Sequence, residues 1–253
     1  MDLSQTTKNI RTTILKMICK SKSPHIGSAF SLVEIMTYLY FKQFKTWDKV
    51  IFSKWHAGSV LYATLAEMWK IDKEKLIDTY CQNWQKLWWH VTLGSIEWVD
   101  ATAGSLWHGL SMGIGMALSL KKNNVFVAIS DGELNEWSIR EWLLFAQQHK
   151  LNNLTVIVDR NKQQAMGHTK DVIRLDKLDI ALDALGWNVQ TINGHDFVEI
   201  EKAFNNSSKD KPNIIIADTI KGKWVDFMED NVDFHYKTPN EEQYQSALQQ
   251  INK

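Results

Sequence analysis

Two segments of the chain decide its fold: VFVAISDGE at Val125–Glu133 and LTVIVDRNKQ at Leu154–Gln163. Each begins with five residues that are almost entirely apolar and largely β-branched, which is typical of a strand buried on both faces. Between them, Ser138–His149 has apolar residues at helical spacing. A strand, a helix and a second strand at these distances predict a right-handed βαβ unit of a parallel sheet.

The same alternation of helices and strands continues on both sides of this unit. Ser31 is followed three residues later by Glu34, a pattern that predicts a helix N-terminus at Ser31. We expect one domain, residues 1–253, of the α/β class, with a doubly wound, mostly parallel sheet and helices on both faces. Helices are expected at 8–19, 31–41, 61–69, 73–80, 109–120, around Ile180 and Phe197 and at 241–251, strands at 50–52, 187–192 and 214–217, and a long irregular segment at 82–106.

Composition excludes several classes of function. The 29 basic and 29 acidic residues cancel, so the chain lacks the excess positive charge of nucleic-acid-binding or membrane-surface proteins. It has no apolar run long enough to span a membrane and no signal-peptide pattern at its start. Its two cysteines, Cys19 and Cys81, are too few for a disulfide framework and are expected to be buried thiols. These features are typical of a soluble cytoplasmic enzyme.

Polar residues follow both strands at the point where each strand should end. Asp131 comes after the first strand and Asn161 after the second. In open parallel sheets, ligands bind beyond the carboxyl ends of the strands, so these two side chains should converge. A carboxylate and an amide oxygen suit Mg²⁺ or Ca²⁺, with phosphates completing the coordination. The alternative is purely structural: Asp131 caps a helix and Asn161 lies in a turn.

The same residues carry a family resemblance. DGELNEW…VDRNKQQ is similar to the thiamine-diphosphate signature, an Asp-Gly followed after a βαβ crossover by Asn. From about Ile10 to Gln243 the chain resembles, in order, the N-terminal half of transketolase, which implies the stand-alone N-terminal subunit of a split transketolase. The other matching segments are SPHIGSAFSLVEI (23–35), SKWHAGSVLYA (53–63), DATAGSLWHGLSMGIGMALSL (100–120), LGWNVQTINGHDF (185–197) and FMEDNVDFHYKTPNEEQY (227–244).

The resemblance implies a role for each matching residue. Asp131, the Asn161 side chain and the Gln163 carbonyl would bind Mg²⁺ (or Ca²⁺ or Mn²⁺), which anchors the diphosphate of thiamine diphosphate. The four histidines with a weaker claim to a role are expected to be loop or surface residues: His108, His149, His168 and His195. The remaining cofactor-binding residues would be Gly104, Ser105, Leu106, Gly132, Glu133 and Glu141, and the catalytic residues His25, His56, His90, His235 and Glu136.

The activity implied is transfer of a two-carbon ketol unit from a ketose phosphate to an aldose phosphate, a reaction of the pentose phosphate pathway. Thiamine diphosphate would supply the electron sink and the protein would supply binding and proton transfer. A C-terminal, pyrimidine-binding subunit would complete the site, in a heterotetramer. Three alternatives remain: the α-type half of a 2-oxoacid dehydrogenase, half of a deoxyxylulose-phosphate synthase, and a degenerate, non-catalytic interaction subunit.

Tryptophan is unusually frequent: the chain has 12 Trp, as many as its 12 Gly. Against the family, a set of these tryptophans stands where glycine is expected, whereas Trp187 matches a tryptophan of the family. Two explanations are open: a degenerate homologue with a filled cleft, or UGA codons that the organism reads as Gly but that were translated as Trp. The set comprises Trp55, Trp88, Trp89, Trp98, Trp107, Trp137 and Trp224, with Trp69 and Trp84 as further candidates.

Overall fold

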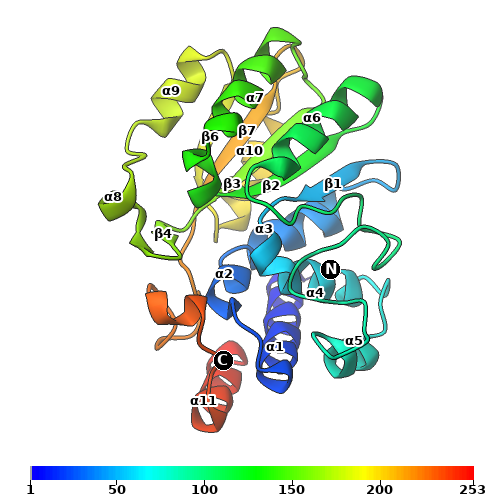
Figure 1. Cartoon of the computed structure of the whole chain (residues 1–253), viewed down its shortest axis with the longest axis vertical. Helices are drawn as coiled ribbons and strands as arrows, with labels where there is room; N and C mark the ends of the chain where they lie inside the picture. Colours follow the sequence, from blue (N-terminus) through cyan, green and yellow to red (C-terminus); the bar gives the residue numbers. More distant parts are fainter. Residues whose placement is uncertain (1) are drawn as a thin grey trace.

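The fold is built on one parallel sheet, shown in Figure 1, a computed structural model that describes residues 2–253. Five strands lie in the order β1-β2-β3-β7-β6, and every neighbouring pair is parallel. The α/β fold class with a parallel sheet, expected from the sequence, is confirmed. The strands are β1 (Lys49–Phe52), β2 (Val125–Ser130), β3 (Leu154–Arg160), β7 (Asn213–Asp218) and β6 (Asn188–Asn193).

The two faces of the sheet bury separate cores because side chains alternate along each strand. On β2, Phe126 and Ala128 face one core, whereas Val125, Val127 and Ile129 face the other. All five side chains are at most 2% exposed, which explains why this strand is a continuous apolar run without polar alternation.

Helices cover both faces of the sheet (Figure 1). The core on the Phe126 side is formed with α1 (Leu3–Ser21), α2 (Ile26–Phe30), α3 (Val33–Tyr38), α4 (Gly58–Glu67) and α10 (Phe197–Asn205). Helices α5 (Lys73–Thr79) and α11 (Glu241–Ile251) pack on α1, farther from the sheet. The Val127 side is packed by α6 (His108–Ser119), α7 (Trp137–Gln148) and α9 (Leu178–Ala184). Shorter elements are the π-helical turn Leu39–Gln43, the 3₁₀ turns Trp55–Ala57, Gly132–Asn135 and Val232–His235, the hairpin β4–β5 (Gln163–Gln164 and Gly167–His168) and α8 (Thr169–Val172).

The predicted helix start at Ser31 is wrong. Helix α3 begins at Val33, its N-cap residue is Leu32, and Ser31 already has helical backbone angles. Because Ser31 continues the turn that ends α2, it has no free helix N-terminus to cap. Its hydroxyl donates instead to the Ser28 carbonyl, at 3.0 Å, and to the carboxylate of Asp159, at 2.6 Å.

The long irregular segment is confirmed, because no helix or strand lies between α5 and α6 in the described residues. Helices α2 and α8 and the β4–β5 hairpin are not predicted by the sequence, because each spans only a few residues. Within the part of the chain that the structure describes, every helix is too short or too polar to cross a membrane.

Candidate active site

The carboxyl ends of β2 and β3 lie side by side. Ser130, the last residue of β2, is in register with Asp159 of β3. Asp131 and Asn161 therefore leave the sheet at the same edge, and both line one cavity of about 640 Å³ together with Gln163. The convergence expected from the sequence is present, while the metal-binding role of these three residues stays a prediction.

Asp131 is held in a buried position by the loop that follows β3. Its Oδ2 accepts hydrogen bonds from the Lys162 amide at 2.8 Å and the Thr169 hydroxyl at 3.2 Å. Burial, and then the negative charge of Asp159, raises the pKa of Asp131 to about 7. A cation bound beside such a buried carboxyl group would stabilise its ionised form.

A buried cation already lies beneath this edge. Lys54 donates to the carboxylate of Asp159, and both side chains are fully buried. Asp159 also accepts hydrogen bonds from the Thr219 hydroxyl and from the Asn161 amide. Burial would raise the pKa of Asp159, but the charge of Lys54 together with the hydrogen bonds from Lys54, Ser31 and Thr219 outweighs burial, and the pKa is lowered. Because the Nδ2 of Asn161 is bound to Asp159, its Oδ1 faces away from that carboxylate.

Three of the four predicted histidines meet on the wall of the same cavity. The ring centroids of His25, His56 and His235 are 4.9 to 5.6 Å apart in every pair. His90 also lines the cavity and reaches the group through Trp55, whose ring centroid is 3.8 Å from its own. Segments far apart in the sequence thus bring the four histidines to one cavity, while the catalytic role of these histidines stays a prediction.

These histidines are neutral at pH 7. Burial, followed by the charge of Lys221, lowers the pKa of His25 to about 4 and that of His235 to about 3. Burial also lowers the pKa of His56, to well below its ordinary value, and that of His90. Neutral imidazoles can accept a proton or hydrogen bond from a hydroxyl group, which is the role of a general base.

Lys221 is a second buried lysine of the site, and the sequence did not single it out. Its Nζ lies 2.8 Å from Nδ1 of His235, and its pKa is lowered to about 8, mainly by burial. The only sequence signal for it is its place in KGK after β7, where a strand end meets the sheet edge. Lys54 and Asp159 were also missed as site residues, since a buried lysine looks like a surface lysine in a sequence.

The other predicted residues are divided between the cavity and its surroundings. Leu106, Gly132 and Glu136 line the cavity. The carboxylate of Glu133 is fully buried outside it, where it accepts hydrogen bonds from Ser53, Ser130 and the Trp107 amide, so it organises the turn. Gly104, Ser105 and Glu141 are exposed and lie outside the cavity wall.

Of the four histidines expected in loops or on the surface, His195 does lie in a loop but is almost completely buried. His108 and His149 are exposed and His168 is half-buried. The side chain of His195 is only 9% exposed and is hydrogen-bonded through both ring nitrogens. Its position in a turn between β6 and α10 did not indicate that the turn packs against α3 and the segment after β7.

Polar atoms without partners are concentrated at the cavity. Within residues 2–253, nine residues have a buried side-chain nitrogen or oxygen that makes no hydrogen bond. Six of the nine line this one cavity: His25, Ser28, Trp55, Asn135, Gln163 and Gln164. Unsatisfied buried polar groups are costly and rare, so their concentration here indicates a bound polar ligand.

A metal ion would need ligands beyond ionisable side chains. Nowhere in residues 2–253 do three or more His, Cys, Asp or Glu side chains form a group suited to a metal. The predicted set differs in kind, since it combines one carboxylate, one amide oxygen and one carbonyl with phosphate oxygens, which are hard ligands suited to Mg²⁺.

Cys19 and Cys81 are free, half-buried thiols whose pKa is raised by burial.

Four tryptophans have the backbone conformation of glycine. Ten non-glycine residues among 2–253 have a positive φ, and four of the ten are Trp69 (61°), Trp84 (65°), Trp107 (81°) and Trp224 (79°). The left-handed region is strained for any side chain with a Cβ and is the usual place for glycine. Trp107 and Trp224 belong to the set that stands at glycine positions of the resemblance, and Trp69 and Trp84 are its two further candidates. Trp187, in contrast, has an ordinary φ and is fully buried.

The fold and the site together define an α/β protein with a polar, histidine-lined cavity at the carboxyl ends of its parallel strands. A family model described as "Transketolase, thiamine diphosphate binding domain" matches residues 3–250. The chain is 33% identical to one of the subunits of the apulose-4-phosphate transketolase of Phocaeicola vulgatus, over 98% of this chain and 92% of that protein. It is also 33% identical to the 6-deoxy-6-sulfo-D-fructose transketolase subunit SqwG of a Clostridium species, over 100% and 97% of the two chains.

A solved structure agrees with these relatives. The crystal structure of Campylobacter jejuni transketolase superposes with a TM-score of 0.90 at 26% identity. The match covers all of this chain and 43% of that one. The chain belongs to the transketolase family, and it corresponds to the family's N-terminal, thiamine-diphosphate-binding domain.

Proposed function

We propose that this chain is the N-terminal subunit of a transketolase that depends on thiamine diphosphate and Mg²⁺. It would transfer a two-carbon ketol unit from a ketose phosphate to an aldose phosphate. The observation that carries the proposal is the convergence of four histidines on one cavity of about 640 Å³. Five other residues on its wall each have at least one buried polar side-chain atom without a hydrogen-bond partner. A sugar phosphate and a diphosphate cofactor are both rich in the hydroxyl and phosphate groups that such a wall recognises.

The residues of the sheet edge would hold the diphosphate and its metal. Asp131, the side-chain oxygen of Asn161 and the main-chain carbonyl of Gln163 provide hard oxygen ligands. The buried pair of Lys54 and Asp159 would keep the Asn161 amide oriented, with its nitrogen on Asp159 and its Oδ1, which accepts a hydrogen bond from the Gln163 amide at 3.1 Å, available to the metal. Thiamine diphosphate, when bound, supplies the electron sink for cleavage of the carbon–carbon bond.

The histidines would handle the protons of the sugar. His25, His56 and His235 are neutral at pH 7, so each can accept a hydrogen bond from a hydroxyl group of the sugar. Glu136, which is half-buried on the same wall, would contribute a carboxylate. Glu133 would act indirectly, because its buried carboxylate fixes the turn that carries Gly132.

A partner subunit would complete the site. Both of the relatives described above are named as subunits of transketolases, and each is covered almost completely by this chain. We infer that a separate C-terminal subunit supplies the pyrimidine-binding half, that the two assemble as a heterotetramer and that residues 1–253 act as one domain. The cytoplasm is the expected compartment.

The alternative of a degenerate, non-catalytic subunit is not favoured. Even with Trp55 and Trp89 on its wall, the cavity is open and keeps its histidines and its carboxylate. The α-type half of a 2-oxoacid dehydrogenase is also less well supported, since the relatives act on sugars by name and the histidine cluster suits hydroxylated substrates.

Reconstitution tests the proposal. The chain and its complementary half are purified separately and assayed for ketol transfer, alone and mixed, with thiamine diphosphate and Mg²⁺. The same assay is run on a version with glycine at Trp55 and Trp107, so that a blocked cleft is recognised as such. We expect activity only in the mixture, and its loss in Asp131→Asn but not in Asp210→Asn, whose side chain is exposed. Activity in neither mixture, or full activity without the partner, would refute the proposal.

A further inference from the structure

The segment Thr219–Lys221 delivers two side chains to the candidate site. The hydroxyl of Thr219 donates to the buried carboxylate of Asp159. The ammonium group of Lys221 lies 2.8 Å from Nδ1 of His235. Both contacts depend on the path of a short stretch that follows β7 and is neither strand nor helix at Thr219 and Ile220. On either side of Ile220, the Thr219 amide donates to the Arg160 carbonyl of β3 at 3.3 Å and the Gly222 amide donates to the Gly27 carbonyl at 3.0 Å. The Ile220 amide between them needs an acceptor of its own.

The turn after β6 provides that contact from the opposite side. The Ile220 amide donates to Nε2 of His195 at 2.9 Å. The neighbouring Gly194 amide donates to the Asp218 carbonyl at 2.8 Å. The approach is so close that a Cβ at position 194 would lie 2.5 Å from Cγ2 of Thr219. The two turns are thus packed directly on each other.

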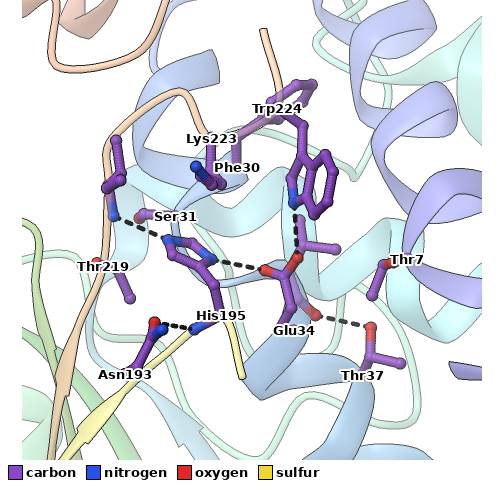
Figure 2. A network of polar contacts seen from close by, with 12 residues as sticks. Thr7, Phe30, Ser31, Glu34, Thr37, Asn193, His195, Thr219, Lys223 and Trp224 are labelled. Atoms are coloured by element: carbon purple, nitrogen blue, oxygen red, sulfur yellow. Dashed lines mark hydrogen bonds and ion pairs between the residues drawn. The ribbon is translucent and has the colours of Figure 1, made fainter. Parts of the chain in front are cut away.

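The ring of His195 is itself held in place by Glu34. Its Nε2 accepts a hydrogen bond, so the ring proton is on Nδ1, which faces Oε2 of Glu34 at 3.0 Å (Figure 2). Glu34 in turn contacts Arg11 through both carboxylate oxygens, at 2.7 and 2.8 Å. Burial would raise the pKa of Glu34, but Arg11 and then His195 lower it to about 2, so the acceptor stays charged. This fixes the tautomer of His195.

We propose that His195 is a positioning residue of the site: held by Glu34 and Arg11, it fixes Ile220 and thereby places Thr219 against Asp159 and Lys221 against His235. The indole nitrogen of Trp224 also donates to Glu34, at Oε1 and 3.0 Å, but the oxygen that contacts His195 is Oε2 (Figure 2). The positioning stands on its own geometry, and only its consequence for activity rests on the proposed transketolase function.

Two variants separate positioning from simple packing. Glutamine places an oxygen where Nε2 of His195 lies, so His195→Gln can still accept the Ile220 hydrogen bond. Asparagine reaches only as far as Nδ1, so His195→Asn can contact Glu34 but leaves the Ile220 amide without its acceptor. Both lose the ring, so a role in packing alone would affect them alike. Melting temperature is measured for both to establish that they fold.

The direct readout is amide hydrogen exchange at Ile220 in the full chain. We expect His195→Asn to exchange there about fivefold faster than the wild type, and His195→Gln to stay within about twofold, since one hydrogen bond is worth about 1 kcal/mol and 1.4 kcal/mol is a factor of ten. The second readout is the histidine titration followed by NMR. The pKa of His235 should rise in His195→Asn, because Lys221 is no longer held beside it, and should stay near its wild-type value in His195→Gln.

Neither readout depends on catalysis, so a chain that failed as a transketolase would still test the positioning of this segment. Equal exchange at Ile220 in the two variants, or an unchanged pKa of His235 in His195→Asn, would overturn the proposal. In the reconstituted enzyme, we expect the turnover number of His195→Asn to fall and that of His195→Gln to be retained in large part. Equal turnover in the two variants would contradict the link to catalysis alone.

Discussion

Lys54 and Asp159 form an ion pair between two completely buried side chains that lie 105 residues apart in the sequence. The Lys54 ammonium group also donates to the Ser28 carbonyl and lies 3.1 Å from the Ser31 hydroxyl. The pair joins the 3₁₀ turn after β1 to the end of β3, directly beneath Asn161. It therefore connects the stability of the fold to the geometry of the proposed metal site.

Removing one partner of this pair should be strongly destabilising. Lys54→Met would leave the Asp159 carboxylate buried without its cation, and we expect a loss of about 3–5 kcal/mol in the free energy of unfolding. Urea denaturation measures the change. The control is Lys20→Met, which removes a pair with Asp78 whose side chains are 51% and 63% exposed. That change should cost less than about 1 kcal/mol, and equal losses in the two variants would contradict the account.

Glycine should stabilise the chain where tryptophan has a left-handed backbone. Trp84 has a φ of 65° and is fully exposed, so Trp84→Gly removes strain without losing a buried contact. We expect a gain of about 1 kcal/mol in the free energy of unfolding. Trp47 is also exposed but lacks a positive φ, so Trp47→Gly should be neutral or destabilising by up to about 1 kcal/mol. A loss of stability in Trp84→Gly would contradict this interpretation.

The codons of these residues decide between the two explanations of the tryptophan set. If glycine is the native residue, the gene carries UGA at Trp55, Trp69, Trp84, Trp107 and Trp224, and UGG at Trp187, which is fully buried in the core. The natural protein would then be lighter than a chain with tryptophan at these sites by one Trp-to-Gly difference per site, which mass spectrometry resolves. UGG codons at all six positions would establish that the tryptophans are real.

Acid should weaken the fold through His235. Its pKa is lowered to about 3 by burial and by Lys221, whereas an unfolded histidine has a pKa near 6.5. Between about pH 3 and 6.5 the unfolded chain binds a proton that the folded chain does not, so the free energy of unfolding falls as the pH falls. Asp131, whose pKa is raised to about 7, has the opposite effect, since its folded form binds the extra proton.

The variant His235→Gln isolates the first effect, because the contribution of Asp131 is common to both proteins. Below about pH 6, the stability of the wild type relative to His235→Gln should fall by about 1.4 kcal/mol per pH unit. Urea titrations at pH 4.5, 5.5 and 7.5 measure this difference. A difference that does not vary with pH would show that His235 titrates normally in the folded chain.

The sequence predicted more of the fold than of the candidate site. Val125–Ile129 and Leu154–Val158 are strands because they are apolar runs of the right length, and the polar residues after them fall at one sheet edge by topology alone. The Ser31 prediction was wrong because a capping pattern is local, whereas the Ser31 hydroxyl is bound by Asp159 across 128 residues. Lys54, Lys221 and His195 were missed for the same reason: their roles depend on burial by segments distant in sequence.

The most direct test of the central claim is the thermal stability of this chain with its proposed cofactor. Thiamine diphosphate with Mg²⁺ should raise the melting temperature through mass action, while thiamine with Mg²⁺, or thiamine diphosphate with a chelator, should not. Asp131→Asn should abolish the rise and Asp210→Asn should preserve it. A rise of equal size with thiamine, or with Asp131→Asn, would mean that the diphosphate and its metal are not held at the ends of β2 and β3.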